Sequence, residues 1–369
     1  MQNIFKGNKN IKNKIAYFCV PADFKKDSLK KFKNLNLKYK DAKIDEVYGS
    51  LPGTVYGSGR SSAYIPDVKL SELKSYIKEC NNCGIKFNYV LNASTLRDRE
   101  FNDVGKKKMV LFIKDLHRAG VRRFTVTLPS IISLISNNFK DVEIVLSTIN
   151  NITSKYQLNE FLSAGRIIRA YVAEEVNRMP HKLRDIVSNS KVPIATILNG
   201  FCLFQCAYRY HHYNFAAFRD KNNICDVDEY YQFRCEQIKA NNPEEVVKIP
   251  WIRPSDIDKY QKIGVDHFKI VGREMVKAGG DMPAVAEAYM AKFYDGDLMD
   301  LLNGFSSLRR GIYSIQSKSL DSCINYIFTK PLDCSRDLCN KCGVCKKYSK
   351  YVKINEKEAK KLPEFKLLK

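Results

Sequence analysis

The chain has 369 residues, of which 62 are Lys or Arg and 40 are Asp or Glu, so its formal net charge at pH 7 is +22. A hydrophobic content of 44% with 11% aromatic residues excludes a disordered, collagenous or low-complexity chain. This length suits either two domains or one α/β barrel with an appendage.

Short β-branched or aromatic runs alternate with longer amphipathic segments, a pattern typical of parallel strands joined by helices. The predicted strands are residues 15–20, 46–50, 85–92, 122–128, 142–147, 167–173, 193–198 and 267–271. The clearest predicted helices are residues 69–79, 104–117, 155–163 and 254–263. Eight strands close a barrel, so the sequence predicts a TIM-type (β/α)8 fold. An open doubly wound sheet is less suitable, because Pro21 and Ala22 stand where its glycine fingerprint would follow the first strand.

Two segments interrupt the barrel pattern, and they set the expected domain organisation. A Cys-rich insertion, residues 199–250, separates the seventh strand from the eighth, and a Cys-rich, Lys-rich tail occupies residues 301–369. The barrel itself is expected over residues 14–300, preceded by a basic arm of residues 1–13. No run of about 18 apolar residues occurs, so we expect no membrane span and a cytoplasmic location.

The insertion contains the first cysteine group, Cys202, Cys206, Cys225 and Cys235, with three, eighteen and nine intervening residues. Thiolates are soft ligands that suit zinc or an iron–sulfur cluster. The loop after a barrel strand opens on the catalytic face, so a metal here would lie beside the substrate cavity. A radical S-adenosylmethionine motif is disfavoured, because its third cysteine position is Arg209. Buried apolar cysteines are the alternative.

The tail contains the second group, Cys334, Cys339, Cys342 and Cys345, with four, two and two intervening residues. Zinc knuckles and ferredoxin-like loops both use such short spacings, so this segment is predicted to bind zinc or a second iron–sulfur cluster. A disulfide framework is the alternative, and the absence of a secretion signal argues against it.

Several polar residues are expected at the mouth of the barrel, and their position there suggests their chemical roles. The loop 57–60 (Gly-Ser-Gly-Arg) could hold a carboxylate or phosphate through backbone amides and Arg60, or be a plain turn. Asn88 and Asn92 share one strand face, where they either line a substrate site or bond to one another.

Four further residues are candidates for catalysis. Glu174 directly follows the sixth strand and could act as a general acid or base, with a rim salt bridge as the alternative. His211 lies beside the first cysteine group and could be a ligand, a proton carrier or a stacked surface residue. Lys269 and Arg273, at the end of the last strand, would direct cations into the mouth.

The order of these motifs resembles peptidase family U32, the collagenase-like proteins. The cysteine group is followed by residues 252–256 (Ile-Arg-Pro-Ser-Asp) and by residues 264–273 (Gly-Val-Asp-His-Phe-Lys-Ile-Val-Gly-Arg), which resemble the family's Ser-Pro-x-Asp-Leu-like and Lys-Ile-Glu-Gly-Arg segments. The resemblance covers roughly residues 14–300, with Val271 in place of the family's glutamate.

The resemblance implies a TIM-type barrel and, in some members, a [4Fe–4S] cluster used to hydroxylate RNA bases or quinone precursors without molecular oxygen, with prephenate as a proposed oxygen donor. Carried over, it implies that Cys202, Cys206, Cys225 and Cys235 hold the cluster. It also places Lys269 and Arg273 in the family's basic motif and Arg253 among candidate substrate-binding residues.

The leading hypothesis is therefore an oxygen-independent iron–sulfur hydroxylase, or a related redox modifier of RNA or of a small aromatic metabolite, served by an electron donor protein. A metal-assisted peptidase is the second hypothesis, although no Ser/His/Asp elbow or His-Glu-x-x-His helix is present in the sequence. A metal-braced binding or maturation module is the third. The dispersed lysines favour a compositional origin of the charge over an RNA-binding surface.

Overall fold

Eight parallel strands form a closed barrel in the computed structural model, which describes residues 14–54, 56–218, 230–308, 310–329, 334 and 338–363. Each strand pairs with the next along the chain, and the last pairs with the first through Phe268 and Phe18. The predicted TIM-type (β/α)8 fold is therefore confirmed. The basic arm predicted for residues 1–13 lies outside the described residues.

The bounds of the strands follow the predicted segments closely. The strands are β1 (Ala16–Pro21), β2 (Ala42–Gly49), β3 (Lys86–Leu91), β4 (Arg123–Val126), β5 (Glu143–Leu146), β6 (Ile167–Tyr171), β7 (Ile194–Ile197) and β8 (His267–Lys269). The largest difference is at β2, which begins four residues before the predicted start at residue 46. In its first half Lys43 and Asp45 alternate with buried residues. Because only one face of this half is apolar, it has no continuous apolar run, and its start was predicted too late.

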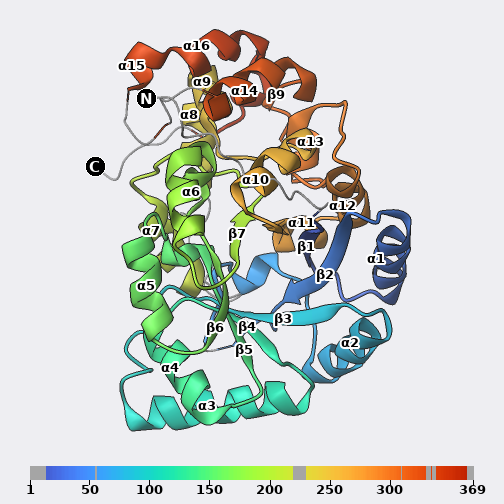
Figure 1. Cartoon of the computed structure of the whole chain (residues 1–369), viewed down its shortest axis with the longest axis vertical. Helices are drawn as coiled ribbons and strands as arrows, with labels where there is room; N and C mark the ends of the chain where they lie inside the picture. The colour runs from blue at the N-terminus through green and yellow to red at the C-terminus, as the bar shows by residue number, and fades with distance from the viewer. Residues whose placement is uncertain are drawn as a thin grey trace.

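A helix follows every strand and packs on the outside of the barrel (Figure 1). These helices are α1 (Lys26–Lys38), α2 (Leu70–Asn82), α3 (Asp103–Arg118), α4 (Pro129–Asn138), α5 (Lys155–Ser163), α6 (Pro180–Ser188), α10 (Ile257–Ile263) and α12 (Met282–Met290). Short helical turns precede some of them: η1 (Ser62–Tyr64), η2 (Thr148–Asn150), η3 (Glu174–Arg178), η4 (Pro254–Asp256) and α11 (Arg273–Lys277). Pro254 begins the segment predicted as one helix, which the structure divides into η4 and α10.

An extra residue in β2 decides what faces the barrel interior. Phe18 pairs with Ile44 but Cys19 pairs with Glu46, so Asp45 has no partner in β1 and the side-chain alternation changes phase there. Because one residue of slip turns the following side chains to the other face, Glu46 and Tyr48 point into the barrel. The interior is consequently polar at this level and not a purely aliphatic core.

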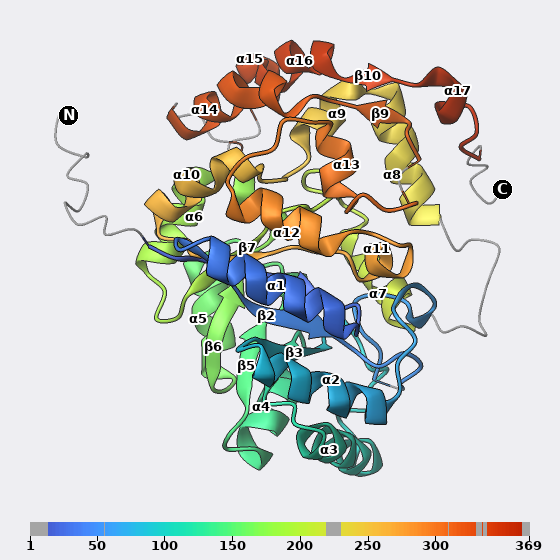
Figure 2. The same cartoon turned by 90° about the vertical axis from the view of Figure 1, so that its right-hand side faces the viewer.

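Part of the insertion lies with the tail on one side of the barrel (Figure 2). The insertion contains α7 (Arg209–Phe218), α8 (Tyr230–Asn241) and α9 (Pro243–Lys248). The tail contains α13 (Leu298–Leu302), β9 (Tyr313–Ser314), η5 (Ser317–Leu320), α14 (Asp321–Thr329), α15 (Cys339–Cys342), α16 (Val344–Tyr348), η7 (Ser349–Tyr351), β10 (Lys353–Ile354) and α17 (Glu356–Ala359). The tail spans the top of Figure 2, where α16 packs on α9 and the antiparallel pair β9–β10 lies beside α8.

No helix in the described part of the chain is both long enough and apolar enough to cross a membrane.

Candidate functional site

The insertion brings three cysteines of the first group together, directly after β7. The Cys206 and Cys235 side chains are hydrogen-bonded to each other, and Cys202 lies close enough to interact electrostatically with both. The bond from Cys235 lowers the pKa of Cys206 to about 6, whereas burial raises the pKa of Cys202 to about 11. Cys225, the fourth predicted ligand, lies outside the described residues.

These sulfur atoms are near one another without forming a closed coordination shell. Among the residues that the structure describes, no three Cys, His, Asp or Glu side chains are grouped as ligands of one metal ion. The chemistry of the donor set is nevertheless uniform, since Cys202, Cys206 and Cys235 offer only sulfur, which suits zinc or an iron–sulfur cluster rather than a hard cation. The predicted metal site therefore stays a prediction.

Glu174 lies beside these cysteines, on η3 at the carboxyl end of β6. It is buried, and its Oε2 atom has no hydrogen-bond partner among the described residues. Burial raises the pKa of Glu174 above its ordinary value, although Arg209 and Arg60 act in the opposite direction. Gly200 leaves room for this carboxyl, because a Cβ there would overlap Oε2. Burial therefore shifts this carboxyl toward its protonated form, which is the direction that a general acid requires.

The neighbouring Glu175 is used differently. Its carboxylate forms an ion pair with Arg209, the first residue of α7, and Arg209 also donates to the carbonyl of Leu203. This pair fixes the start of the insertion against the barrel. The two neighbouring carboxyls therefore differ: Glu175 is paired with Arg209, whereas Glu174 Oε2 has no hydrogen-bond partner among the described residues.

The loop that contains Arg60 is held by specific contacts. The Gly59 amide donates to Asn92 Oδ1 at 2.8 Å, and Arg60 Nε lies 3.2 Å from Glu274 Oε1. Gly57 has a φ of +55°, and a Cβ there would overlap the carbonyl oxygen of Ala217 in α7. The loop is therefore a fixed wall of the mouth. Its Gly59 amide and its guanidinium already have protein partners.

Arg273 and Lys269 both lie at the mouth, as the sequence predicted. Arg273 Nη1 donates to the hydroxyls of Ser50 and Ser58 at 3.0 and 3.1 Å. Lys269 Nζ stands 3.8 Å from the centre of the Tyr48 ring, inside the barrel. Burial lowers the pKa of Lys269 to about 8. A lysine with this pKa is partly neutral at physiological pH, so it can act as a base or nucleophile.

Asn88 lies deeper in the barrel than Asn92, and its amide is occupied there. It donates to Glu46 Oε1 at 2.9 Å and accepts from Thr125 Oγ1 at 3.0 Å. Glu46 in turn binds Arg123 at 2.5 Å and Arg169 at 2.7 Å. The structure thus gives Asn88 a place in a buried ionic network and leaves only Asn92, which is bonded to the Arg60 loop, near the mouth.

Two other predicted residues lie away from the mouth chemistry. His211 is exposed on α7 and stacks edge-on against Tyr208, whereas its neighbour His212 is close to Arg60 and has a pKa lowered to about 4 by burial. Arg253 is buried and binds Asp256 and Asp321, with Nε–Oδ2 and Nη1–Oδ1 distances of 2.7 and 2.6 Å. Arg253 therefore ties the barrel to α14 in the tail.

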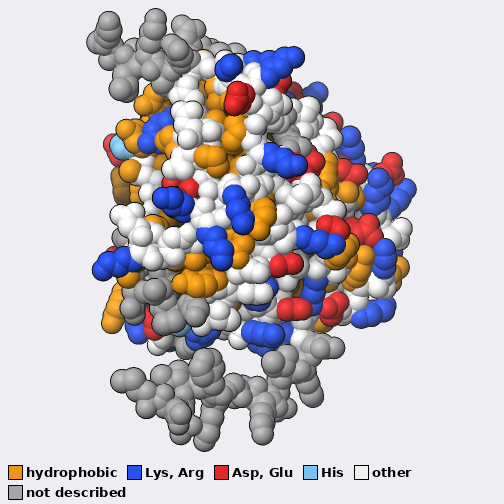
Figure 3. Space-filling model, turned by 90° about the horizontal axis from the view of Figure 1, so that it is seen from above, with side chains coloured by type: hydrophobic (Ala, Val, Ile, Leu, Met, Phe, Trp, Pro, Cys, Tyr) orange, Lys and Arg blue, Asp and Glu red, His pale blue; other side chains and the backbone are white. Residues whose placement is uncertain are grey.

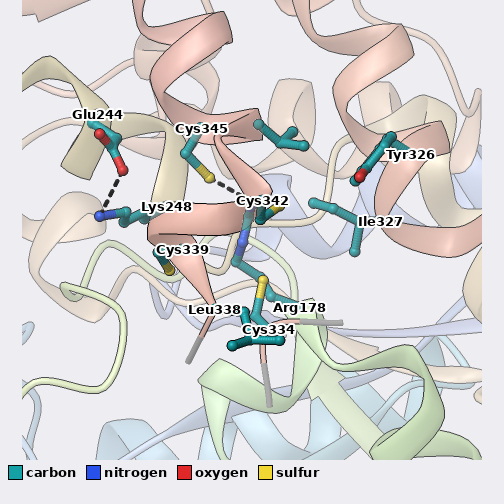
Figure 4. A pocket seen from close by; sticks show the side chains of 11 residues that line it. Arg178, Glu244, Lys248, Tyr326, Ile327, Cys334, Leu338, Cys339, Cys342 and Cys345 are labelled. Atoms are coloured by element: carbon teal, nitrogen blue, oxygen red, sulfur yellow. Dashed lines mark hydrogen bonds and ion pairs between the residues drawn. The ribbon is translucent and has the colours of Figure 1, made fainter. Parts of the chain in front are cut away.

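The second cysteine group surrounds a separate pocket between the tail and η3. Cys334, Cys339, Cys342 and Cys345 all line a cavity of about 40 Å³, and Arg178 enters it from below (Figure 4). The Arg178 guanidinium donates to Cys345 Sγ at 3.4 Å. The four residues predicted to bind metal thus line one pocket, apart from the barrel cysteines, without forming a closed set of ligands in the described part of the chain.

Sequence reasoning missed several residues that the fold places at these sites. Tyr48 lies on the same strand face as Glu46, and the alternation around it could have indicated an interior position. Arg178 was visible only as a charged residue after a strand, and nothing local in the sequence connects it with cysteines more than 150 residues later.

Comparison with known proteins gives a consistent match. Residues 30–296 match the family model described as Peptidase family U32. An uncharacterized protease of Methanocaldococcus jannaschii is 29% identical over 332 residues, covering 88% of this chain and 95% of that protein.

Two solved structures resemble the fold more loosely. A U32 peptidase structure has a TM-score of 0.49 at 14% identity, covering 69% of this chain and 91% of that one. The copper homeostasis protein CutC of Streptococcus agalactiae has a TM-score of 0.37 at 11% identity, covering 69% of this chain and 98% of that one.

Proposed function

This chain belongs to peptidase family U32, and on that premise we propose that it is an iron–sulfur enzyme that hydroxylates, or otherwise modifies by redox chemistry, RNA or a small aromatic metabolite without molecular oxygen. The observation that carries the proposal is the proximity of Cys202, Cys206 and Cys235 to one another and to the buried Glu174, whose Oε2 atom has no partner among the described residues, at the carboxyl face of the barrel. This is the face on which TIM barrels place their chemistry.

The cluster would be held by Cys202, Cys206, Cys225 and Cys235, and when bound it would supply electron transfer. Glu174 would hold or release a proton at its Oε2 atom. Lys269 and Arg273 would present positive charge at the floor of the mouth to an anionic donor such as prephenate. The Arg60 loop, held in place by Asn92 and α7, would limit access of water.

A metal-assisted peptidase is the second candidate function. It is favoured by the name of the archaeal relative, an uncharacterized protease. In that case Glu174 would serve as the base for a metal-bound water. Release of peptides from a protein substrate by zinc-loaded, iron-free enzyme would support this alternative and contradict the first.

The hypothesis that RNA is the substrate rests on the net charge of +22 and needs a separate test. On the face seen in Figure 3, Lys and Arg side chains are scattered among uncharged atoms and form no continuous track. If RNA is bound, its affinity should fall steeply with salt concentration. Negligible binding at moderate salt would leave the small metabolite as the substrate class.

The experiment that tests the proposal is anaerobic purification followed by iron and sulfide analysis and electron paramagnetic resonance. We expect Cys202→Ala to lose about four iron atoms per chain relative to the wild type. Cys80→Ala is the control, because Cys80 is a buried cysteine that lies on α2, away from the mouth. Wild-type protein without iron, or a Cys202→Ala variant with unchanged iron, would contradict the proposal.

A further inference from the structure

Arg178 is a buried cation whose surroundings lack an obvious counter-ion. Only 3% of the residue is exposed, and it follows β6 on η3, four residues after Glu174. Its Nη2 atom donates to Cys345 Sγ, and its Nη1 atom has no partner among the described residues. Within that same part of the chain, no carboxylate lies within ion-pair distance of the guanidinium.

A guanidinium stays protonated in proteins, so this charge cannot be removed by loss of a proton. Burying an unpaired charge costs several kcal/mol, and folded proteins avoid it by pairing the charge or binding it to an ion. Negative charge must therefore come from the groups around Arg178, which are the sulfur atoms of Cys345, Cys334 and Cys323.

Free thiols do not meet this requirement well. A neutral thiol is a weak acceptor, and several separate thiolates in one pocket would repel one another. A metal resolves both difficulties, because four thiolates bound to Zn²⁺ or to a [4Fe–4S]²⁺ core form a compact centre with two net negative charges. Such a centre is a suitable partner for one buried arginine.

The local backbone also brings the sulfurs to one side. Cys339 and Cys342 are the first and last residues of α15, and Cys345 lies in the first turn of α16. Gly343 joins the two helices with a φ of +60°, a conformation that lets the chain reverse between them. In Figure 4 the Cys345 sulfur is hydrogen-bonded to Arg178, and Cys334, Cys339 and Cys342 line the same pocket.

We propose that Cys334, Cys339, Cys342 and Cys345 hold a dianionic metal–thiolate centre, zinc or an iron–sulfur cluster, and that Arg178 is its buried counter-ion. The centre is independent of the barrel cysteines. Because Arg178 and Glu174 are the two ends of η3, about 8 Å apart along a 3₁₀ helix, the tail centre fixes the segment that positions the carboxyl at the mouth.

The first test compares the metal content of full-length variants purified anaerobically. Cys342→Ser should lose the tail metal, seen as one zinc or about four iron atoms per chain, and retain the metal that Cys202→Ala removes. Cys323→Ser is the matched control, because Cys323 is buried and contacts Arg178 but lies outside the four-cysteine spacing. It should keep the wild-type metal content.

The elements lost distinguish zinc from iron, and the two cysteine variants separate this proposal from the proposed function. If Cys202→Ala alone changes the metal content, the tail centre is refuted while the barrel cluster stands. If Cys342→Ser alone changes it, the reverse holds. Metal loss in Cys323→Ser equal to that in Cys342→Ser would refute the assigned ligand set.

The second test concerns the counter-ion and does not depend on removing a ligand. Arg178→Met should release its tail metal to a chelator at least tenfold faster than the wild type, and Arg178→Lys should restore part of the difference. Without a dianionic centre, Arg178→Met would remove an uncompensated charge and raise the unfolding temperature. Unchanged metal release, or a more stable Met variant, would overturn the role given to Arg178.

Discussion

Replacing Lys269 by Met should stabilise the protein at neutral pH, because the site keeps a charged amine out of water. Lys269 lies at the end of β8 and is only 8% exposed. Burial lowers its pKa from the ordinary 10.5 to about 8. At about 1.4 kcal/mol per pH unit, this difference is a cost of about 3 kcal/mol for keeping the amine charged in the folded protein.

The methionine variant would also lose the contact between Lys269 Nζ and the Tyr48 ring, worth about 1 kcal/mol. The expected net gain at pH 7 is therefore about 2 kcal/mol in the free energy of unfolding. Above pH 8 the folded lysine loses its proton before the unfolded one does, so wild-type stability rises between pH 8 and 10.5. The advantage of the variant should shrink over this range.

Urea unfolding of Lys269→Met and wild type at pH 7 and pH 10 measures the gain in unfolding free energy and its change with pH. Lys269→Arg is the matched control, since its guanidinium stays charged and should show no gain at either pH. A Met variant less stable than wild type at pH 7, or a stability difference that does not change with pH, would refute the reasoning that Lys269 is a destabilised, partly neutral amine.

Three further outcomes are expected from the barrel and its mouth. Glu46→Gln should lower the free energy of unfolding by about 3 kcal/mol, because Arg169 loses its closest anionic partner. Although burial opposes it, the surrounding arginines hold the pKa of Glu46 below its ordinary value, so the effect should be full above about pH 5 and fade in acid urea titrations. Glu174→Gln should raise the unfolding temperature at pH 7, because burial raises the pKa of Glu174 and disfavours the charge, while abolishing any turnover that needs its proton; a lower unfolding temperature would contradict this. Gly57→Ala should destabilise the fold by at least about 1 kcal/mol in urea unfolding, through its positive φ and the overlap with the Ala217 carbonyl, and a neutral result would show that the loop relaxes.

Some features of the site could be predicted from the sequence, and others could not. The cysteine spacings predicted two separate groups, and the structure brings the described members of each group together at different places. Position after a strand placed Glu174 and Lys269 correctly at the mouth. It could not tell that Glu175 would be paired with Arg209 or that Asn88 would be used inside the barrel, because those partners come from distant strands and helices.

The sequence by itself determined the barrel, because alternation of apolar runs and amphipathic segments is a local property that adjacent residues carry. Only the tertiary structure decided which side chains face inward and what they meet. The register shift at Asp45, which has no partner residue in β1, turns Glu46 into the barrel, and closure of the barrel sets Lys269 against Tyr48. Docking of the tail brings Cys345 to Arg178. The burial of a charged group depends on such long-range contacts. The shifted pKa values, and the buried Arg178 without a carboxylate partner among the described residues, can therefore be recognised only in the tertiary structure.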